Sequence, residues 1–331
     1  MKALVLGKGK SGTAAAALLK AQGCEVDFAD GYDCVVVSPG LRTKSELQFG
    51  CEELRRRGWK LLAVTGSKGK SSVVKLVADA INLAGGHAVA CGNYGLPVCE
   101  VVNSNIRTSE HSNNSPWAVV EVSSFMMETT TLPPDTFEAA VILNLQEDHL
   151  DRHGSVEVYH GLKRKLLTFA TRNFANGGMS SDQRTNGPSE RLWTGSYFDN
   201  EILAGNAAMA VELMRVAGLD DAAIARAFRA FKPLPHRMNL VADVDGVCYI
   251  DDSKATSIAA LVAGVKMASS SIRTIRLIAG GLPKGDDPKM ALSVLTERVK
   301  KVYLIGQSAE AFFAAWNGAV DCEICGTMDR A

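Results

Sequence analysis

The chain of 331 residues is longer than one typical domain, so we expect two or three domains. Hydrophobic residues make up 47% of the sequence and charged residues 22%, as in ordinary globular proteins. The 36 basic and 36 acidic side chains cancel, which argues against a nucleic-acid partner, and no apolar run is long enough to span a membrane. The eight cysteines are scattered, and only Cys322 and Cys325 have a metal-like spacing, without a second pair. We therefore expect reduced thiols in a cytoplasmic protein.

The first part of the chain, residues 1–59, alternates strands and helices. Strands are predicted over residues 3–6 and 34–37, and helices over residues 13–21 and 42–57. Residues 7–12 fit the G-x-G-x-x-G pattern between the first strand and helix, and Asp30 lies near the distance of a ribose-binding acid. Taken alone, this turn suggests an NAD enzyme, but it would hold any pyrophosphate or uridine diphosphate group equally well.

The second part, residues 60–232, opens with the most informative segment of the chain. A buried strand starting near Leu61 runs into a glycine-containing turn and a helix over residues 71–83. The turn is a shortened nucleotide-binding loop, which lacks the first glycine of the full pattern. Its N–H groups and the helix dipole would cradle an anion, Lys70 would reach the outer phosphates, and Ser71 would bind Mg²⁺.

Further along, strands are predicted over residues 117–122 and 139–143, helices over 159–169 and 206–217, and loops over 103–116 and 172–189. Glu121 ends a strand expected beside the nucleotide-loop strand, which is a common Mg²⁺ position. His149 stands among carboxylates after the next strand, so we interpret it as a second metal ligand. Lys163, Arg164 and Lys165 would by default form a solvated helix face.

The third part, residues 233–331, follows a proline-containing linker at 231–235. Strands are predicted over residues 247–250, 275–279 and 302–305. Acids and lysines at 251–256 and 280–287 end the first two of these strands, which we predict to be neighbours. Alternation of strands and helices along the whole chain predicts parallel sheets covered by helices on both faces.

Six ordered motifs resemble the Mur ligases of peptidoglycan synthesis. They lie at residues 65–72, 92–97, 121–125, 144–152, 234–237 and 252–256. The Ser-Ser-Phe form at 123–125 and the Leu-Pro-His-Arg form at 234–237 are most similar to the family member that adds D-glutamate.

This resemblance implies an α/β fold of three domains. They would be a short Rossmann-like domain for a UDP substrate (1–59), a central P-loop ATPase-like parallel sheet (60–232) and a Rossmann-like C-terminal domain (233–331). The implied activity is an ATP-dependent acid–D-amino-acid ligase with two Mg²⁺ ions. It would act as a monomer on UDP-N-acetylmuramoyl-L-alanine and D-glutamate, through an acyl phosphate.

The resemblance also implies roles for individual residues. Nucleotide binding would fall to Gly66, Ser67, Lys68, Gly69, Lys70, Ser71, Ser72, Asn93, Asn206, Arg237 and Asp252. Substrate binding would fall to Gly9, Lys10, Ser11, Asp30, Ser38, Pro39, Gly40, Asn93, Ser123, Ser124, Thr256 and Lys284. Metal ions would be held by Ser71, Glu121, His149 and a carbamylated Lys163. The catalytic set would be Lys70, His149, Lys163, Lys254 and Lys284.

The sequence also departs from the family pattern. Lys68 stands where the family has asparagine, and Ile202-Leu203 replaces a His-Asn pair. The chain ends at Ala331, before the family's last strand and its D-glutamate-wrapping segment, so we expect an incomplete third domain and slow or absent ligation. Three alternatives stay open: a folylpolyglutamate-synthase-like glutamate ligase, which lacks the 7–12 module; a degenerate ligase that only binds nucleotide; and an NAD dehydrogenase.

Overall fold

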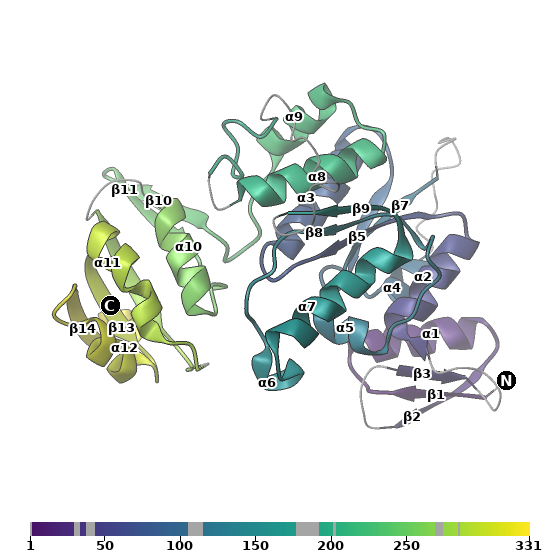
Figure 1. Cartoon of the computed structure of the whole chain (residues 1–331), viewed down its shortest axis with the longest axis horizontal. Helices are drawn as coiled ribbons and strands as arrows, with labels where there is room; N and C mark the ends of the chain where they lie inside the picture. Colours follow the sequence, from purple (N-terminus) through teal and green to yellow (C-terminus); the bar gives the residue numbers. More distant parts are fainter. Residues whose placement is uncertain are drawn as a thin grey trace. The chain divides into compact units, whose positions relative to one another are not determined.

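The structure is a computed structural model that describes residues 2–29, 34–37, 44–104, 115–176, 192–200, 203–268, 274–283 and 285–331. The chain forms two compact units, Met1–Phe231 and Lys232–Ala331 (Figure 1). The boundary between them falls inside the predicted linker at 231–235. The first two predicted domains both lie in the first unit, so their division at residue 59 stays a prediction. Among the described residues, no helix is long and apolar enough to cross a membrane.

The first unit begins with a four-stranded sheet in the order β2-β1-β3-β4. Its strands are β1 (Lys2–Leu6), β2 (Glu25–Ala29), β3 (Cys34–Val37) and β4 (Lys44–Ser45). Helix α1 (Lys10–Ala21) joins the parallel pair β1 and β2, but β3 runs antiparallel to β1 and β4. The expectation of purely parallel sheets is therefore wrong here. Helix α2 (Glu46–Arg56) begins only at Glu46, because the Ser45 side chain accepts from the Gln48 N–H and caps the helix.

A five-stranded parallel sheet forms the centre of this unit, in the order β6-β7-β5-β8-β9. The strands are β5 (Lys60–Thr65), β6 (Ala88–Gly92), β7 (Trp117–Glu121), β8 (Phe137–Ile142) and β9 (Ala170–Ala175). The predicted pairing of the Glu121 strand with the nucleotide-loop strand is confirmed. Strand β9 occupies the start of the segment 172–189 that we predicted to be a loop, and residues 177–189 lie outside the described part of the chain.

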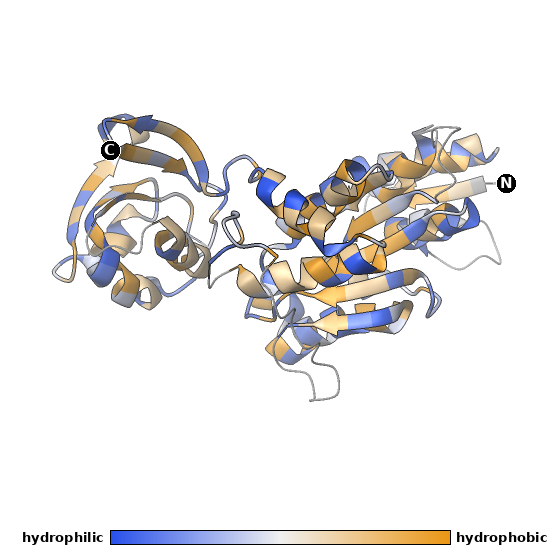
Figure 2. Ribbon diagram, turned by 90° about the horizontal axis from the view of Figure 1, so that it is seen from above, coloured by the Kyte–Doolittle hydropathy of each residue, from blue (hydrophilic) through white to orange (hydrophobic). Residues whose placement is uncertain are grey.

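Helices cover both faces of the central sheet. Helices α3 (Lys70–Leu83), α8 (Ala204–Val216) and α9 (Asp221–Ala230) share one apolar core with alternate strand residues such as Leu62 and Val64. Helices α1, α2 and α4 (Val98–Asn103) share the opposite core with Leu61 and Ala63. Burial on both faces explains why these strands are continuous apolar runs, visible as orange stretches in Figure 2. The core that contains Leu61 and Ala63 also includes residues of β1, and this packing joins the small sheet to the central one.

After β7 and β8 come four short helical elements, and the first three contribute residues to the site described below. They are α5 (Ser124–Thr129), α6 (Leu150–His153), α7 (Val156–Lys165) and the 3-10 turn η1 (Leu166–Phe169).

The second unit contains two separate sheets. A hairpin of β10 (Asn239–Val244) and β11 (Val247–Asp251) is antiparallel, whereas β12 (Ile275–Gly280), β13 (Val299–Ile305) and β14 (Asp321–Gly326) are parallel. The helical elements are α10 (Ile258–Ala268), η3 (Pro288–Ala291), α11 (Leu292–Arg298), α12 (Ala309–Trp316) and η4 (Met328–Arg330). Our prediction that the strands ending near Asp251 and Gly280 are neighbours is wrong. The Asp245-Gly246 pair, both with positive φ, makes a tight turn that commits β11 to a hairpin.

Candidate functional site

The central sheet brings three polar segments together at the carboxyl ends of its strands. Strand β5 lies between β7 and β8, because the chain crosses to the other side of β5 after β7. Such a switch in strand order opens a crevice at the carboxyl edge of a parallel sheet. The segments that follow the three strands are the nucleotide loop 66–72, residues 121–124, and residues 144–149.

The nucleotide loop requires glycine where it approaches α8. Gly69 has φ 85°, and a Cβ atom there would lie 2.1 Å from Nδ2 of the buried Asn206. Helix α3 starts at the next residue without a side-chain cap, so its first-turn N–H groups have no acceptor within the helix. Lys70 Nζ donates to the carbonyl oxygens of Gly66 (2.9 Å) and Ser67 (3.2 Å). This loop therefore offers N–H donors, a helix dipole and an ammonium group to an anion.

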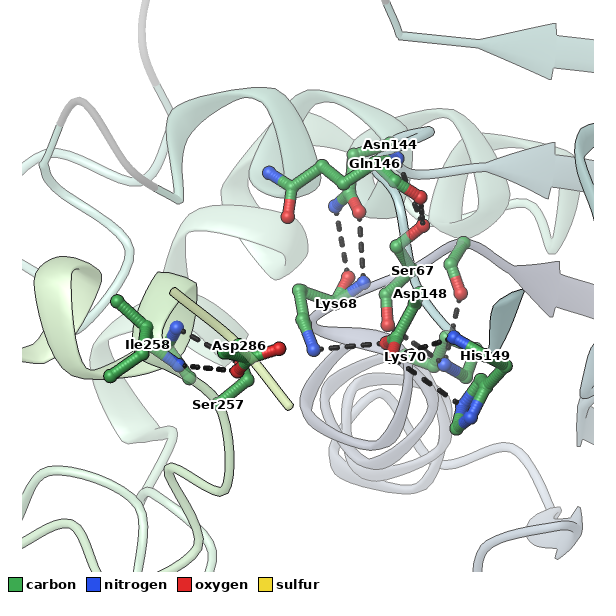
Figure 3. A network of polar contacts seen from close by, with 12 residues as sticks. Ser67, Lys68, Lys70, Asn144, Gln146, Asp148, His149, Ser257, Ile258 and Asp286 are labelled. Carbon is green, nitrogen blue, oxygen red and sulfur yellow. Dashed lines mark hydrogen bonds and ion pairs between the residues drawn. The ribbon is translucent and has the colours of Figure 1, made fainter. Parts of the chain in front are cut away.

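The segment after β8 fixes the main chain of this loop (Figure 3). Asn144 accepts from the Lys68 N–H through Oδ1 (2.8 Å) and donates to the Lys68 carbonyl through Nδ2 (2.9 Å). The Ser67 hydroxyl exchanges hydrogen bonds with both the N–H (2.9 Å) and the carbonyl (3.0 Å) of Gln146. Asn144 opens the motif at 144–152 but is absent from the predicted site residues, although its place just after a buried strand is a usable signal. The loop is thus held in one shape before any ligand binds.

Glu121 presents a buried carboxylate at the same edge. Its side chain is almost fully buried, and Oε1 accepts from Nδ2 of Asn93 at 2.8 Å. Its other oxygen, Oε2, is also buried and makes no hydrogen bond with any residue that the structure describes. A buried carboxylate oxygen without a partner is costly, so a bound cation is the natural partner. The Glu121 carboxylate and the hydroxyl of Ser71, in the first turn of α3, are oxygen donors of the type that Mg²⁺ prefers.

His149 holds an unusual backbone conformation where residues 144–149 lead into α6. It lies in the left-handed region (φ 53°, ψ 34°), which non-glycine residues seldom adopt outside functional or tightly held sites. Its N–H donates to Oδ1 of Asp148 at 3.2 Å. The half-exposed imidazole lies 4.9 Å from the Phe125 ring and 6.2 Å from that of Tyr159, between ring centroids.

Lys163 is buried below the nucleotide loop. Its side chain is 1% exposed, Nζ donates to the Gly66 carbonyl at 3.0 Å, and Nζ lies 4.4 Å from the Tyr159 ring centroid. The default interpretation of 163–165 as a solvated face is therefore wrong for Lys163, although Arg164 is exposed. Burial, together with the positive charge of Lys70, lowers the pKa of Lys163 to about 7. Near neutral pH, a large share of this side chain is an uncharged amine.

A second group of polar residues supports the site from the side of α5. His153 is stacked between Phe125 and Tyr159, at centroid distances of 5.3 and 5.5 Å. Its Nε2 lies 3.0 Å from the Ser124 hydroxyl, and its Nδ1 lies 3.3 Å from Oε1 of Glu128. Ser123 caps α5 by accepting from the Met126 N–H. Both serine hydroxyls thus have partners within this unit, and their role in substrate binding stays a prediction.

The structure describes only some of the predicted site residues that lie outside the central sheet. Gly9, Lys10 and Ser11 lie at the start of α1, where Gly9 supplies no side-chain cap. Five predicted residues lie outside the described part of the chain: Asp30, Ser38, Pro39, Gly40 and Lys284.

In the second unit, the predicted residues lie on two turns that are hydrogen-bonded to each other. Asp252 Oδ1 accepts from the Met238 N–H, and the Lys254 N–H donates to the His236 carbonyl, both at 3.0 Å. Burial raises the pKa of Asp252, and the charge of Arg237 opposes this rise. Lys254 and Thr256 are exposed.

Comparison with known proteins identifies the family. A model of the Mur ligase middle domain matches residues 64–179. A protein of Acidobacterium capsulatum named UDP-N-acetylmuramoylalanine–D-glutamate ligase is 31% identical over 415 aligned residues, which cover 100% of this chain and 87% of that protein. The chain belongs to the Mur ligase family. Membership makes it a ligase of peptidoglycan synthesis that uses ATP, as the motifs had predicted.

Solved structures of Mur ligases share the fold. MurF from Acinetobacter baumannii has a TM-score of 0.63 at 16% identity, covering 96% of this chain and 80% of that one. MurF from Thermotoga maritima, solved in complex with ADP, has a TM-score of 0.60 at 12% identity, covering 97% and 84%. These likenesses confirm the predicted α/β Mur ligase fold.

Proposed function

We propose that this Mur ligase joins D-glutamate to UDP-N-acetylmuramoyl-L-alanine in the cytoplasm, with ATP and two Mg²⁺ ions. The observation that carries the proposal is the buried Glu121 oxygen without a partner, at the same sheet edge as the nucleotide loop. D-glutamate as the amino acid is supported by the name of the 31% identical relative and by the Ser-Ser-Phe and Leu-Pro-His-Arg motifs.

The reaction would proceed in two steps, and the first brings two negatively charged groups close together. The substrate carboxylate would attack the γ-phosphate of ATP, forming an O–P bond as ADP leaves. The neutral amine of D-glutamate would then form the C–N bond of the amide as phosphate leaves, and the nitrogen would lose one proton. Two anions about 4 Å apart repel by roughly 4 kcal/mol at an effective dielectric constant near 20. The Lys70 ammonium group would offset this repulsion, and bound Mg²⁺ would supply further positive charge.

The metal ligands would be contributed by two pairs of residues. Ser71 and Glu121 would hold one ion, and His149 and a carbamylated Lys163 the other. The low pKa of Lys163 supports this modification, because only the neutral amine can attack CO₂. The attack would form an N–C bond and release a proton, which leaves an anionic carbamate in place of a cation.

The remaining predicted residues would bind the substrates. Asn93 and Asn206, with Arg237 and Asp252, would contact ATP. Lys254, Thr256 and Lys284 would orient D-glutamate and the acceptor, and Ser123 and Ser124 would also contact substrate. The UDP group would be held by Gly9, Lys10, Ser11, Asp30, Ser38, Pro39 and Gly40. We propose a three-domain monomer divided near residues 59 and 232.

Phosphate release from ATP tests the proposal directly. We expect release to require UDP-N-acetylmuramoyl-L-alanine and to rise when D-glutamate, but not L-glutamate, is added, with the amide product detected by mass spectrometry. Product with a folate acceptor instead would favour the folylpolyglutamate-type alternative. ATP binding without any product would identify a degenerate ligase.

The turn at residues 7–12 is expected to bind uridine nucleotides and not nicotinamide nucleotides. The order of the Mur motifs outweighs the G-x-G-x-x-G pattern, which fits any pyrophosphate. Calorimetric titration with UDP and with NAD measures both affinities on the same protein. Tight NAD binding with weak UDP binding would contradict this assignment.

A further inference from the structure

The backbone and the side chain of Lys68 both form hydrogen bonds with the segment after β8 (Figure 3). Its N–H and its carbonyl are both bonded to the side-chain amide of Asn144. The main chain at Lys68 is therefore tied to the segment after β8. Its side chain extends away from the loop, and Nζ donates to Oδ2 of Asp148 at 3.0 Å.

Asp148 uses its two carboxylate oxygens for two different contacts. Oδ2 accepts from Lys68, and Oδ1 accepts from the N–H of His149 at 3.2 Å. The pair is only partly open to solvent, since the side chains of Lys68 and Asp148 are 36% and 25% exposed. Screening by water is therefore weaker than for a fully exposed ion pair. The contacts form one chain from the nucleotide loop to the backbone of His149.

His149 needs such support because of its conformation. A histidine in the left-handed region persists only where its surroundings hold it there. The following helix α6 has four residues and offers little rigidity of its own, although the N–H groups of Arg152 and His153 both donate to the His149 carbonyl. The Asp148 carboxylate supplies the matching contact on the N–H side of His149.

We infer that Lys68 is a positioning residue, whose ion pair with Asp148 holds residues 147–149 against the nucleotide loop and so fixes His149. The role of His149 as a metal ligand rests on the proposed function, but the ion pair and the left-handed residue do not. The side chain of Lys68 acts on the protein and not on the nucleotide. The asparagine of the family pattern carries no charge and could not form this pair.

Hydrogen exchange of the metal-free, nucleotide-free protein tests the positioning role without any reliance on activity. In Lys68→Met, we expect peptides spanning residues 144–153 to exchange about tenfold faster than in the parent protein. Lys68→Arg, which keeps the charge, should stay within about twofold of the parent. Asp148→Asn should reproduce the Lys68→Met result, and it provides a second variant if Lys68→Met does not fold.

Lys75→Met is the matched control. It removes a lysine of α3, the helix that follows the nucleotide loop, and this lysine is paired with Asp79 and lies over the Phe231 ring. We expect unchanged exchange over 144–153 in this variant. Unchanged exchange in Lys68→Met, or an equal increase in Lys75→Met, would overturn the inference.

Binding of Mn²⁺ in the presence of a non-hydrolysable ATP analogue gives a second readout. Lys68→Met should weaken one of two Mn²⁺ sites about tenfold and leave the other within about twofold. In an Asp148→Asn background, the same substitution should add less than about twofold. If Lys68→Met weakened binding of the nucleotide analogue equally in the parent protein and in Asp148→Asn, this would instead mean that Lys68 contacts the nucleotide. A single Mn²⁺ site in the parent would contradict the proposed second metal, whereas the exchange result would still decide the role of Lys68.

Discussion

Lys70→Ala is expected to lower ATP-dependent phosphate release by about three orders of magnitude, or about 4 kcal/mol of transition-state stabilisation. The Lys70 ammonium group lies across the loop on the carbonyl oxygens of Gly66 and Ser67, where the outer phosphates would bind. The measurement is phosphate release with UDP-N-acetylmuramoyl-L-alanine and D-glutamate present. Circular dichroism should show an intact fold, because α3 and its apolar core do not depend on this side chain.

Glu121→Gln tests the proposed metal ligand of the same site and should lower ATP-dependent phosphate release by a similar factor. Glutamine can still accept from Asn93, but it removes the negative charge whose second oxygen has no protein partner among the described residues. Glu121→Ala should act likewise. Lys75→Ala, on the same helix as Lys70, is the control and should retain parent activity. Unchanged phosphate release in either site variant would refute the nucleotide and metal assignment.

Lys163→Ala is expected to lose most activity, and acetate or another short carboxylate should restore part of it. The substitution removes the group that would carry the carbamate, and a small carboxylate could enter the space left by the buried side chain. A rescue of this kind is specific, because a purely structural loss would not respond to an added anion. Activity close to that of the parent without added carboxylate would show that Lys163 has no such role.

The pH dependence of Lys163 gives an independent check. Its pKa of about 7 is lowered from the ordinary lysine value, so the ammonium form dominates below this pH and the reactive amine above it. Activity of the parent should therefore rise with pH between about 6 and about 8, and removal of CO₂ should lower it. Acetate-rescued Lys163→Ala should lack that rise, because acetate stays charged throughout this range. A parallel rise in both proteins would assign the pH dependence to another group.

The sequence by itself was sufficient for features that depend on neighbouring residues. The strand, turn and helix of 60–83 are contiguous, and their apolar run, glycines and lysine are enough to predict an anion site. The Glu121 strand was correctly placed beside β5, because strands that alternate with helices form parallel sheets whose carboxyl ends meet. The motif order was sufficient for the family.

Other features were decided only by the tertiary structure. The antiparallel pairing of β3 depends on which strands meet, and β-strand patterns in the sequence do not encode partners. The β10–β11 hairpin, by contrast, has a local signal in the Asp245-Gly246 turn. Lys163 follows the pattern of an exposed helix face, yet the packing of α7 below the nucleotide loop buries it and lowers its pKa. Lys68 meets Asn144 and Asp148 across 76 and 80 residues of sequence. Contacts over such separations arise when the sheet brings β5 and β8 side by side, and no local pattern specifies them.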